Sequence, residues 1–144
     1  MDAYFDSGII VKLYVKETNS LNAISLVGRY TAPHCLTHWQ ALEVKNAIRL
    51  KAFRNEISTE EMALSIRAFD QDIAAGRWQF PAYSTLAVEQ RADELSASYS
   101  AILGCRSLDI IHVAAALILG AKQFVTFDQR QASMAKHVGL TVVS

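Results

Sequence analysis

Short strand-like runs alternate with longer helix-like segments along the chain, and this alternation limits the possible folds more than any other feature of the sequence. The last third shows it most clearly, as helix Leu108–Leu119, Gly120, strand Gln123–Phe127, helix Gln129–His137, Gly139 and strand Leu140–Val143. Glycine commonly follows the last turn of a helix. Strands joined by helices pair in parallel, with right-handed crossovers. The sequence therefore predicts an α/β fold with a central parallel sheet of four to five short strands, flanked by helices.

The first two thirds follow the same pattern with more irregular spacing. The predicted elements are strand Ala3–Phe5, helix Gly8–Tyr14, an amphipathic segment Leu21–Tyr30, strand Ala32–Leu36, helix His38–Phe53 with Thr37 as N-cap, a helix from Ser58 or Thr59 to about Gly76, at most a short edge strand in Trp78–Tyr83, and helix Ser84–Leu103 ended by Gly104. A chain of 144 residues, of which 51% are apolar, suits one domain spanning residues 1–144.

Charge and cysteine content exclude several classes of protein. The 14 basic residues balance the 14 acidic ones, so contact with RNA would depend on a local basic patch. Cys35 and Cys105 are isolated, as expected of buried thiols in a reducing compartment. The longest apolar run, Ile110–Ala121, is too short to span a bilayer, and no signal peptide is visible, so we expect a cytoplasmic protein without a membrane anchor.

Two acids stand where strands end, which is where functional groups gather in parallel α/β sheets. Asp6 follows the first strand and Asp128 follows the strand Gln123–Phe127. Each also has a simpler interpretation as a helix N-cap, and Gln131 could complete a capping box with Asp128. Either acid alone therefore leaves both interpretations open.

Two further acids lie inside helical segments. Asp109 follows a possible N-cap, Ser107, and its apolar neighbours indicate burial. Glu43 lies in mid-helix, on one face with Trp39, Ala47 and Leu50, and an acid in an apolar stripe needs a partner. Lys45 and Asn46 are poorly spaced to supply one.

Four carboxylates on one side of a sheet would repel each other by about 4 kcal/mol per close pair, unless a cation lies among them. Mg²⁺ or Mn²⁺ suits such oxygen ligands. The four histidines form no close metal-binding pair, and we expect His112 to support its neighbours rather than bind metal. Motifs for nucleoside triphosphate hydrolysis, dinucleotide binding and serine hydrolysis are missing from the sequence.

Three blocks of the sequence resemble PIN-domain proteins of the VapC toxin type, and the resemblance extends from one end of the chain to the other. They are Tyr4-Phe5-Asp6-Ser7 with Glu43 in a later helix, the run from Arg106 to Ala116 around Asp109, and the run from Phe124 to Gln131 around Asp128. The family often has a second hydroxyl residue after Ser7, where this chain has Gly8.

The resemblance implies a Rossmann-like fold and a metal-dependent endoribonuclease. The positions matching Asp6, Glu43, Asp109 and Asp128 would form the catalytic site, and Asp6, Asp109 and Asp128 would bind Mg²⁺ or Mn²⁺ while Glu43 orients or deprotonates water. The implied partners are a structured RNA such as a tRNA, a cognate antitoxin and a second copy of the chain. Candidates for contacting the substrate or supporting a ligand are Ser7, Lys45, Arg49, Arg106, Thr126 and Arg130.

Two rival functions stay open at this point. A metal-dependent phosphohydrolase with Asp6 as nucleophile would need an acid two residues later, where Gly8 stands. A catalytically silent partner-binding domain would use the acids only as helix caps.

Overall fold

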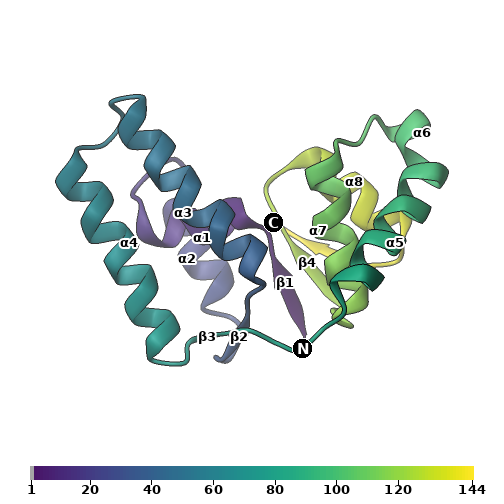
Figure 1. The fold of residues 1–144 in the computed structure, drawn as a ribbon, viewed down its shortest axis with the longest axis horizontal. Coiled ribbons are helices and arrows are strands. Elements are labelled where there is room, and N and C mark those ends of the chain that lie inside the picture. Colours follow the sequence, from purple (N-terminus) through teal and green to yellow (C-terminus); the bar gives the residue numbers. More distant parts are fainter. Residues whose placement is uncertain (1) are drawn as a thin grey trace. The chain divides into compact units, whose positions relative to one another are not determined.

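The computed structural model describes residues 2–144, which form helices and five short strands (Figure 1). The chain divides into two compact units, one made of residues 2–6 and 82–144 and the other of residues 7–81. The α/β class is confirmed, but the strands do not form one central sheet. They form a sheet of three strands and a separate sheet of two. That the two units act as a single domain stays a prediction.

The unit of residues 2–6 and 82–144 contains a parallel sheet in the order β1-β4-β5. Its strands are β1 (Ala3–Phe5), β4 (Gln123–Val125) and β5 (Thr141–Val143). Phe5 is in register with Val125, so β1 and β4 end at the same level. Asp6 and Thr126, the next residues along each chain segment, are thereby brought to the same edge of the sheet.

Helices pack around this sheet. They are α5 (Thr85–Leu95), the π-helical turn η1 (Ser96–Ser100), α6 (Ala101–Leu103), α7 (Ser107–Ile118) and α8 (Gln129–His137). α7 packs against both α5 and α8. Buried Tyr4 and Phe124 from the sheet, Val113 from α7 and Met134 from α8 form the core. The helical segment predicted over Ser84–Leu103 is confirmed, with Ser84 as its N-cap and a π-helical turn within it, and Gly104 ends it as predicted, with φ of 66°.

The unit of residues 7–81 is mainly helical. Its elements are α1 (Ser7–Tyr14), α2 (Ser20–Val27), β2 (His34–Cys35), α3 (His38–Phe53), α4 (Thr59–Ala74) and β3 (Trp78–Gln79). α1 packs against α2, α3 and α4, and β2 pairs in parallel with β3. Thr37 caps α3 in a full capping box with Gln40, and Ser58 caps α4.

Several boundaries differ from the sequence prediction by a few residues. The structure confirms the bounds of β1, α3 and α8, but the other strands are shorter than predicted and α2 ends at Val27 instead of Tyr30. α7 begins at Ser107, so the predicted cap at Ser107 is wrong: Arg106 holds the N-cap position, without a side-chain capping bond. Cys35 and Cys105 are free thiols and only partly buried.

Within residues 2–144, no helix has both the length and the apolar character needed to cross a membrane.

Candidate active site

Asp6 and Thr126 begin the candidate site, because each directly follows a strand of the three-stranded sheet. The backbone N–H of Asp6 donates to the carbonyl of Val125, which extends the pairing of β1 with β4 by one residue. Both side chains are buried, with Asp6 8% exposed and Thr126 1%. The Thr126 hydroxyl lies 3.4 Å from Asp6 Oδ2. The sheet therefore fixes one carboxylate and one hydroxyl side by side.

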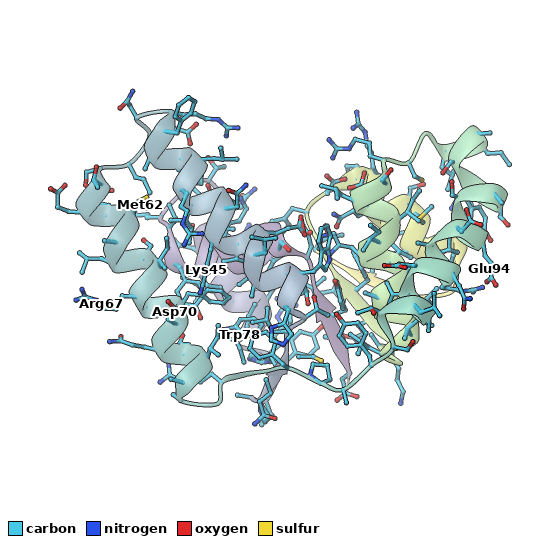
Figure 2. All side chains as sticks on the ribbon, in the orientation of Figure 1. Lys45, Met62, Arg67, Asp70, Trp78 and Glu94 are labelled. Atoms are coloured by element: carbon cyan, nitrogen blue, oxygen red, sulfur yellow. The ribbon has the colours of Figure 1, made fainter. Side chains whose placement is uncertain are left out.

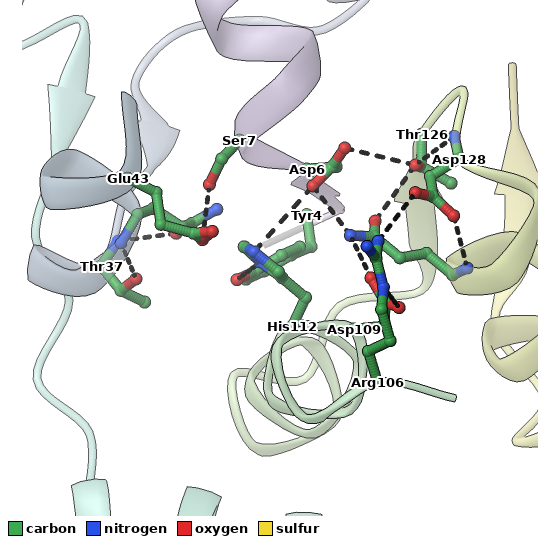
Figure 3. A network of polar contacts seen from close by, with 12 residues as sticks. Tyr4, Asp6, Ser7, Thr37, Glu43, Arg106, Asp109, His112, Thr126 and Asp128 are labelled. Atoms are coloured by element: carbon green, nitrogen blue, oxygen red, sulfur yellow. Dashed lines mark hydrogen bonds and ion pairs between the residues drawn. The ribbon is translucent and has the colours of Figure 1, made fainter. Parts of the chain in front are cut away.

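Asp109 joins Asp6 from the first turn of α7, where it is only 2% exposed. Its Oδ1 and the Oδ1 of Asp6 accept hydrogen bonds from the same donor, Nε2 of Gln131, at 3.4 and 3.1 Å. Two acids more than a hundred positions apart in the sequence thus meet at one nitrogen atom (Figure 3). The buried position predicted for Asp109 is confirmed.

Asp128 caps α8, which confirms the simpler interpretation of this residue. Its Oδ1 accepts from the backbone N–H groups of Arg130 and Gln131, at 2.8 and 3.2 Å. The predicted capping box with Gln131 is wrong, because the Asp128 N–H donates instead to the Thr126 hydroxyl, at 3.0 Å. The Gln131 side chain is thereby available to the acids. The cap leaves Asp128 partly exposed beside the buried pair.

Arg106 is the positive charge in contact with these acids. Its Nε donates to Asp109 Oδ2 at 3.2 Å, and its Nη2 lies 3.8 Å from Asp128 Oδ2. The hydrogen bond and the charge of Asp109 raise the pKa of the Arg106 guanidinium. The side chain is 63% exposed, so solvent weakens the ion pair considerably.

His112 and Tyr4 lie beneath Asp6. Tyr4 Oη and His112 Nδ1 are hydrogen bonded at 2.9 Å, and His112 Nε2 lies 4.0 Å from Asp6 Oδ1. Tyr4 also stacks on Phe124, with ring centroids 5.5 Å apart. Both polar rings are almost fully buried, so they link the carboxylate of Asp6 to the apolar core. This placement agrees with the supporting role predicted for His112.

Glu43 belongs to the other unit, where its Oε1 accepts a hydrogen bond of 3.1 Å from the hydroxyl of Ser7 (Figure 3). The apolar stripe predicted around it, formed by Trp39, Ala47 and Leu50, is not the buried face of α3. The buried face of α3 is formed by Gln40, Val44 and Ile48, and Glu43 is only partly buried at the margin of that face. Ser7, which comes directly after Asp6 in the chain, supplies the partner that the sequence failed to identify.

The basic candidates differ in how far they are engaged. Lys45 on α3 points toward Asp70 on α4, and the two are ion-paired at 2.6 Å (Figure 2). Arg49 and Arg130 are exposed, and neither forms an ion pair within residues 2–144. Arg49 and Arg130 are therefore better placed than Lys45 to meet an anionic ligand.

Gln131 is the site residue that sequence reasoning missed. It is 5% exposed, and its Nε2 is the donor shared by Asp6 and Asp109. A glutamine at the third position of a helix is an ordinary capping-box residue, so the sequence gave no reason to assign it to the acids.

The donor chemistry of this cluster fits a divalent cation. Asp6, Asp109 and Asp128 belong to one polar network with the exposed guanidinium of Arg106, the neutral amide of Gln131 and the ring of His112. Hard cations such as Mg²⁺ and Mn²⁺ prefer oxygen ligands of this kind. In the part of the chain that the structure describes, however, no three acidic, histidine or cysteine side chains already converge at metal-binding distance. Binding would require the carboxylates to move toward one another.

Neither the models of known protein families nor the curated proteins contain a match to this chain.

Proposed function

We propose that this protein is a Mg²⁺- or Mn²⁺-dependent endoribonuclease with a PIN-like, Rossmann-related fold, acting as the toxin of a VapBC-type toxin–antitoxin module in the cytoplasm. The observation that carries the proposal is the meeting of Asp6 and Asp109 at one amide nitrogen, at the edge where two parallel strands end. The motifs around Asp6, Asp109 and Asp128 support the same function through their resemblance to that family.

The acids would divide the chemistry between them. Asp6, Asp109 and Asp128 would hold the cation, which when bound supplies a site for the scissile phosphate and lowers the pKa of a coordinated water. The Tyr4–His112 pair supports Asp6 from the core side. Ser7 orients the carboxylate of Glu43, to which we assign the task of orienting the attacking water or accepting its proton.

The proposed substrate is a structured RNA with accessible unpaired nucleotides, such as a tRNA. The overall charge is zero, so binding would depend on local cations, and of the three basic candidates Lys45, Arg49 and Arg130, the last two are exposed and form no ion pair within residues 2–144. The proposed protein partners are a cognate antitoxin and a second copy of the chain.

Cleavage of RNA by the purified protein tests this function. We expect cleavage of a labelled tRNA pool with Mg²⁺ or Mn²⁺, and none after chelation with EDTA. Asp6→Asn should abolish cleavage, whereas Asp93→Asn, on an exposed acid of α5 in the same unit, should leave it unchanged. Expression in bacteria should arrest growth with the wild type but not with Asp6→Ala. Equal cleavage by wild type and Asp6→Asn would disprove the assignment.

One rival function has specific support from the structure. Asp128 serves as a helix cap, and Arg106 and Gln131 donate hydrogen bonds to Asp109, as expected of a catalytically silent binding domain. That alternative predicts no cleavage under any metal condition and no growth arrest. Release of phosphate from small esters with RNA left intact would instead favour the phosphohydrolase, which Gly8 already disfavours.

A further inference from the structure

The amide of Gln131 occupies the point between the two most buried acids. Its Nε2 lies 3.1 Å from Asp6 Oδ1 and 3.4 Å from Asp109 Oδ1. An amide nitrogen carries two protons, so it can donate one to each carboxylate. The contact therefore uses the full donor capacity of this group.

Thr126 fixes the direction in which this amide points. Its hydroxyl accepts a hydrogen bond from the Asp128 N–H and has a single proton of its own to donate. The nearer acceptor is Gln131 Oε1, at 3.1 Å, compared with 3.4 Å to Asp6 Oδ2. Donation to Oε1 turns the carbonyl of the amide toward Thr126 and the NH₂ group toward the acids.

A cation bound by both carboxylates would need the space that Nε2 now fills. Oxygen ligands lie about 2.0 to 2.1 Å from Mg²⁺, whereas hydrogen bonding to the amide keeps both oxygens at 3.1 Å or more from the nitrogen. The amide also brings no positive charge, so it satisfies the hydrogen-bonding needs of the acids without neutralising them.

We propose that Gln131 is a positioning residue that holds the place of the divalent cation in the metal-free protein and is displaced when the cation binds. This inference rests on the metal site of the proposed function, and it adds a competing internal group to that site. Gln131 keeps Asp6 and Asp109 facing one point, at the cost of a weaker affinity for the metal.

The inference predicts the sign of the effect of removing the amide. Gln131→Met keeps the side-chain volume and helix propensity but removes both donors. The metal-free variant leaves two buried carboxylates without their shared donor, whereas the metal-bound variant loses little. By linkage, Mn²⁺ should bind the variant more tightly than the wild type, by about tenfold. Loss of an ordinary supporting residue would weaken metal binding instead.

Calorimetric titration with Mn²⁺ alone tests the inference, together with thermal unfolding with and without Mn²⁺. The control is Gln129→Met, the same substitution at an exposed position of α8, which should bind Mn²⁺ as the wild type does. Gln131→Asn keeps an amide but is one methylene too short to reach both acids, and we expect a smaller shift in the same direction. This variant decides the question if Gln131→Met does not fold.

Tighter Mn²⁺ binding by the Gln131 variants, with a larger Mn²⁺-induced rise in Tm than in the wild type, supports the inference. Binding by the variant alone, with none by the wild type, supports it as well. Equal or weaker binding, or no binding by any of the proteins, overturns it. RNA cleavage is measured separately. Tighter Mn²⁺ binding by the variants without RNA cleavage would disprove the ribonuclease function but support the role of Gln131. RNA cleavage together with unchanged Mn²⁺ affinity in the variants would support the ribonuclease function but disprove the role of Gln131.

Discussion

Asp72 in one unit and Asp109 in the other each pair with an arginine close in sequence, but the remaining partners of the two acids differ. Arg77 Nη1 lies 2.9 Å from Asp72 Oδ1, and the Tyr14 hydroxyl donates to Asp72 Oδ2 at 2.7 Å. Asp109 pairs with Arg106 at 3.2 Å, and its second oxygen shares the amide of Gln131 with Asp6. Asp72 has two donors of its own, whereas Asp109 shares Arg106 with Asp128 and Gln131 with Asp6.

This difference separates a structural network from a candidate ligand site. Around Asp72, the indole N–H of Trp78 donates to the Tyr14 hydroxyl at 2.7 Å, so donors and acceptors are matched along the chain of contacts. Around Asp109, the exposed guanidinium of Arg106 contacts Asp109 and Asp128, and the neutral amide of Gln131 contacts Asp109 and Asp6. A partly buried cluster that holds more carboxylates than cations gains more from a bound metal ion than a matched network does.

The largest effect is expected for Asp109→Asn, which removes one negative charge from the cluster of Asp6, Asp109 and Asp128. RNA cleavage should fall by about 100-fold or more, because a neutral amide oxygen is a much weaker ligand for a hard cation. Stability without metal should change little, since lost pairing with the exposed Arg106 is offset by weaker repulsion from Asp6. Cleavage assays and urea unfolding measure the two quantities. RNA cleavage at the wild-type rate by Asp109→Asn would contradict the assignment of the Asp109 network as a metal site.

Asp72→Asn is the matched change in the other network, and its effect should fall on stability instead. The substitution weakens a charge-assisted hydrogen bond with Tyr14 and an ion pair with Arg77, so the free energy of unfolding should fall by about 2 kcal/mol. We expect RNA cleavage to stay within about twofold of the wild-type rate at a temperature where both proteins are folded. An unchanged urea midpoint would show that this network contributes little to the fold.

The features that the sequence could predict depend on contacts between residues close together in the chain. Thr37 and Gln40 form their capping box within one helical turn, and Gly104 ends a helix through its own backbone conformation. Such features depend on neighbours in the chain, so their patterns indicate them. The predictions of α3, of α8 with Asp128 as its cap, and of Asp6 directly after β1 succeeded for this reason. Asp128 does not directly follow β4, because that strand ends at Val125.

The features that could not be predicted depend on distant partners. The split of five strands into sheets of three and two follows from pairings such as His34 with Trp78. The π-helical turn at Ser96–Ser100 lies within a helical segment and contains no proline or glycine that would indicate a change of helix type. Gln131 had a satisfactory local role as a capping residue, and only the approach of Asp6 and Asp109 assigns it another. Among the candidate acids, the partner of Glu43 could not be identified from the sequence, because Ser7 lies 36 positions away.

Alkaline pH should weaken the Asp72 network through Tyr14. Burial, together with the hydrogen bond to Asp72, raises the pKa of Tyr14 above its ordinary value of about 10. The unfolded chain then loses this proton at a lower pH than the folded protein, so stability falls as the pH rises above about 10. Urea midpoints measured at increasing pH should drop more steeply for the wild type than for Tyr14→Phe. Parallel curves for the two proteins would show that Tyr14 ionises alike in both states.

The smallest effect is expected for Arg106→Gln, which removes the one guanidinium shared by Asp109 and Asp128. A positive charge beside the acids opposes a second cation, so Mn²⁺ should bind the variant about threefold more tightly at low ionic strength. Arg106 is largely exposed, so this difference should vanish near 1 M salt, where the screening length is about 3 Å. Arg91→Gln, which breaks an exposed pair with Glu94 in the same unit, is the matched control and should leave Mn²⁺ affinity unchanged. Weaker binding by Arg106→Gln would mean that the arginine holds the acids in place for the metal, as an arginine does in the Asp72 network, and the distinction between the two networks would then rest on Gln131 alone.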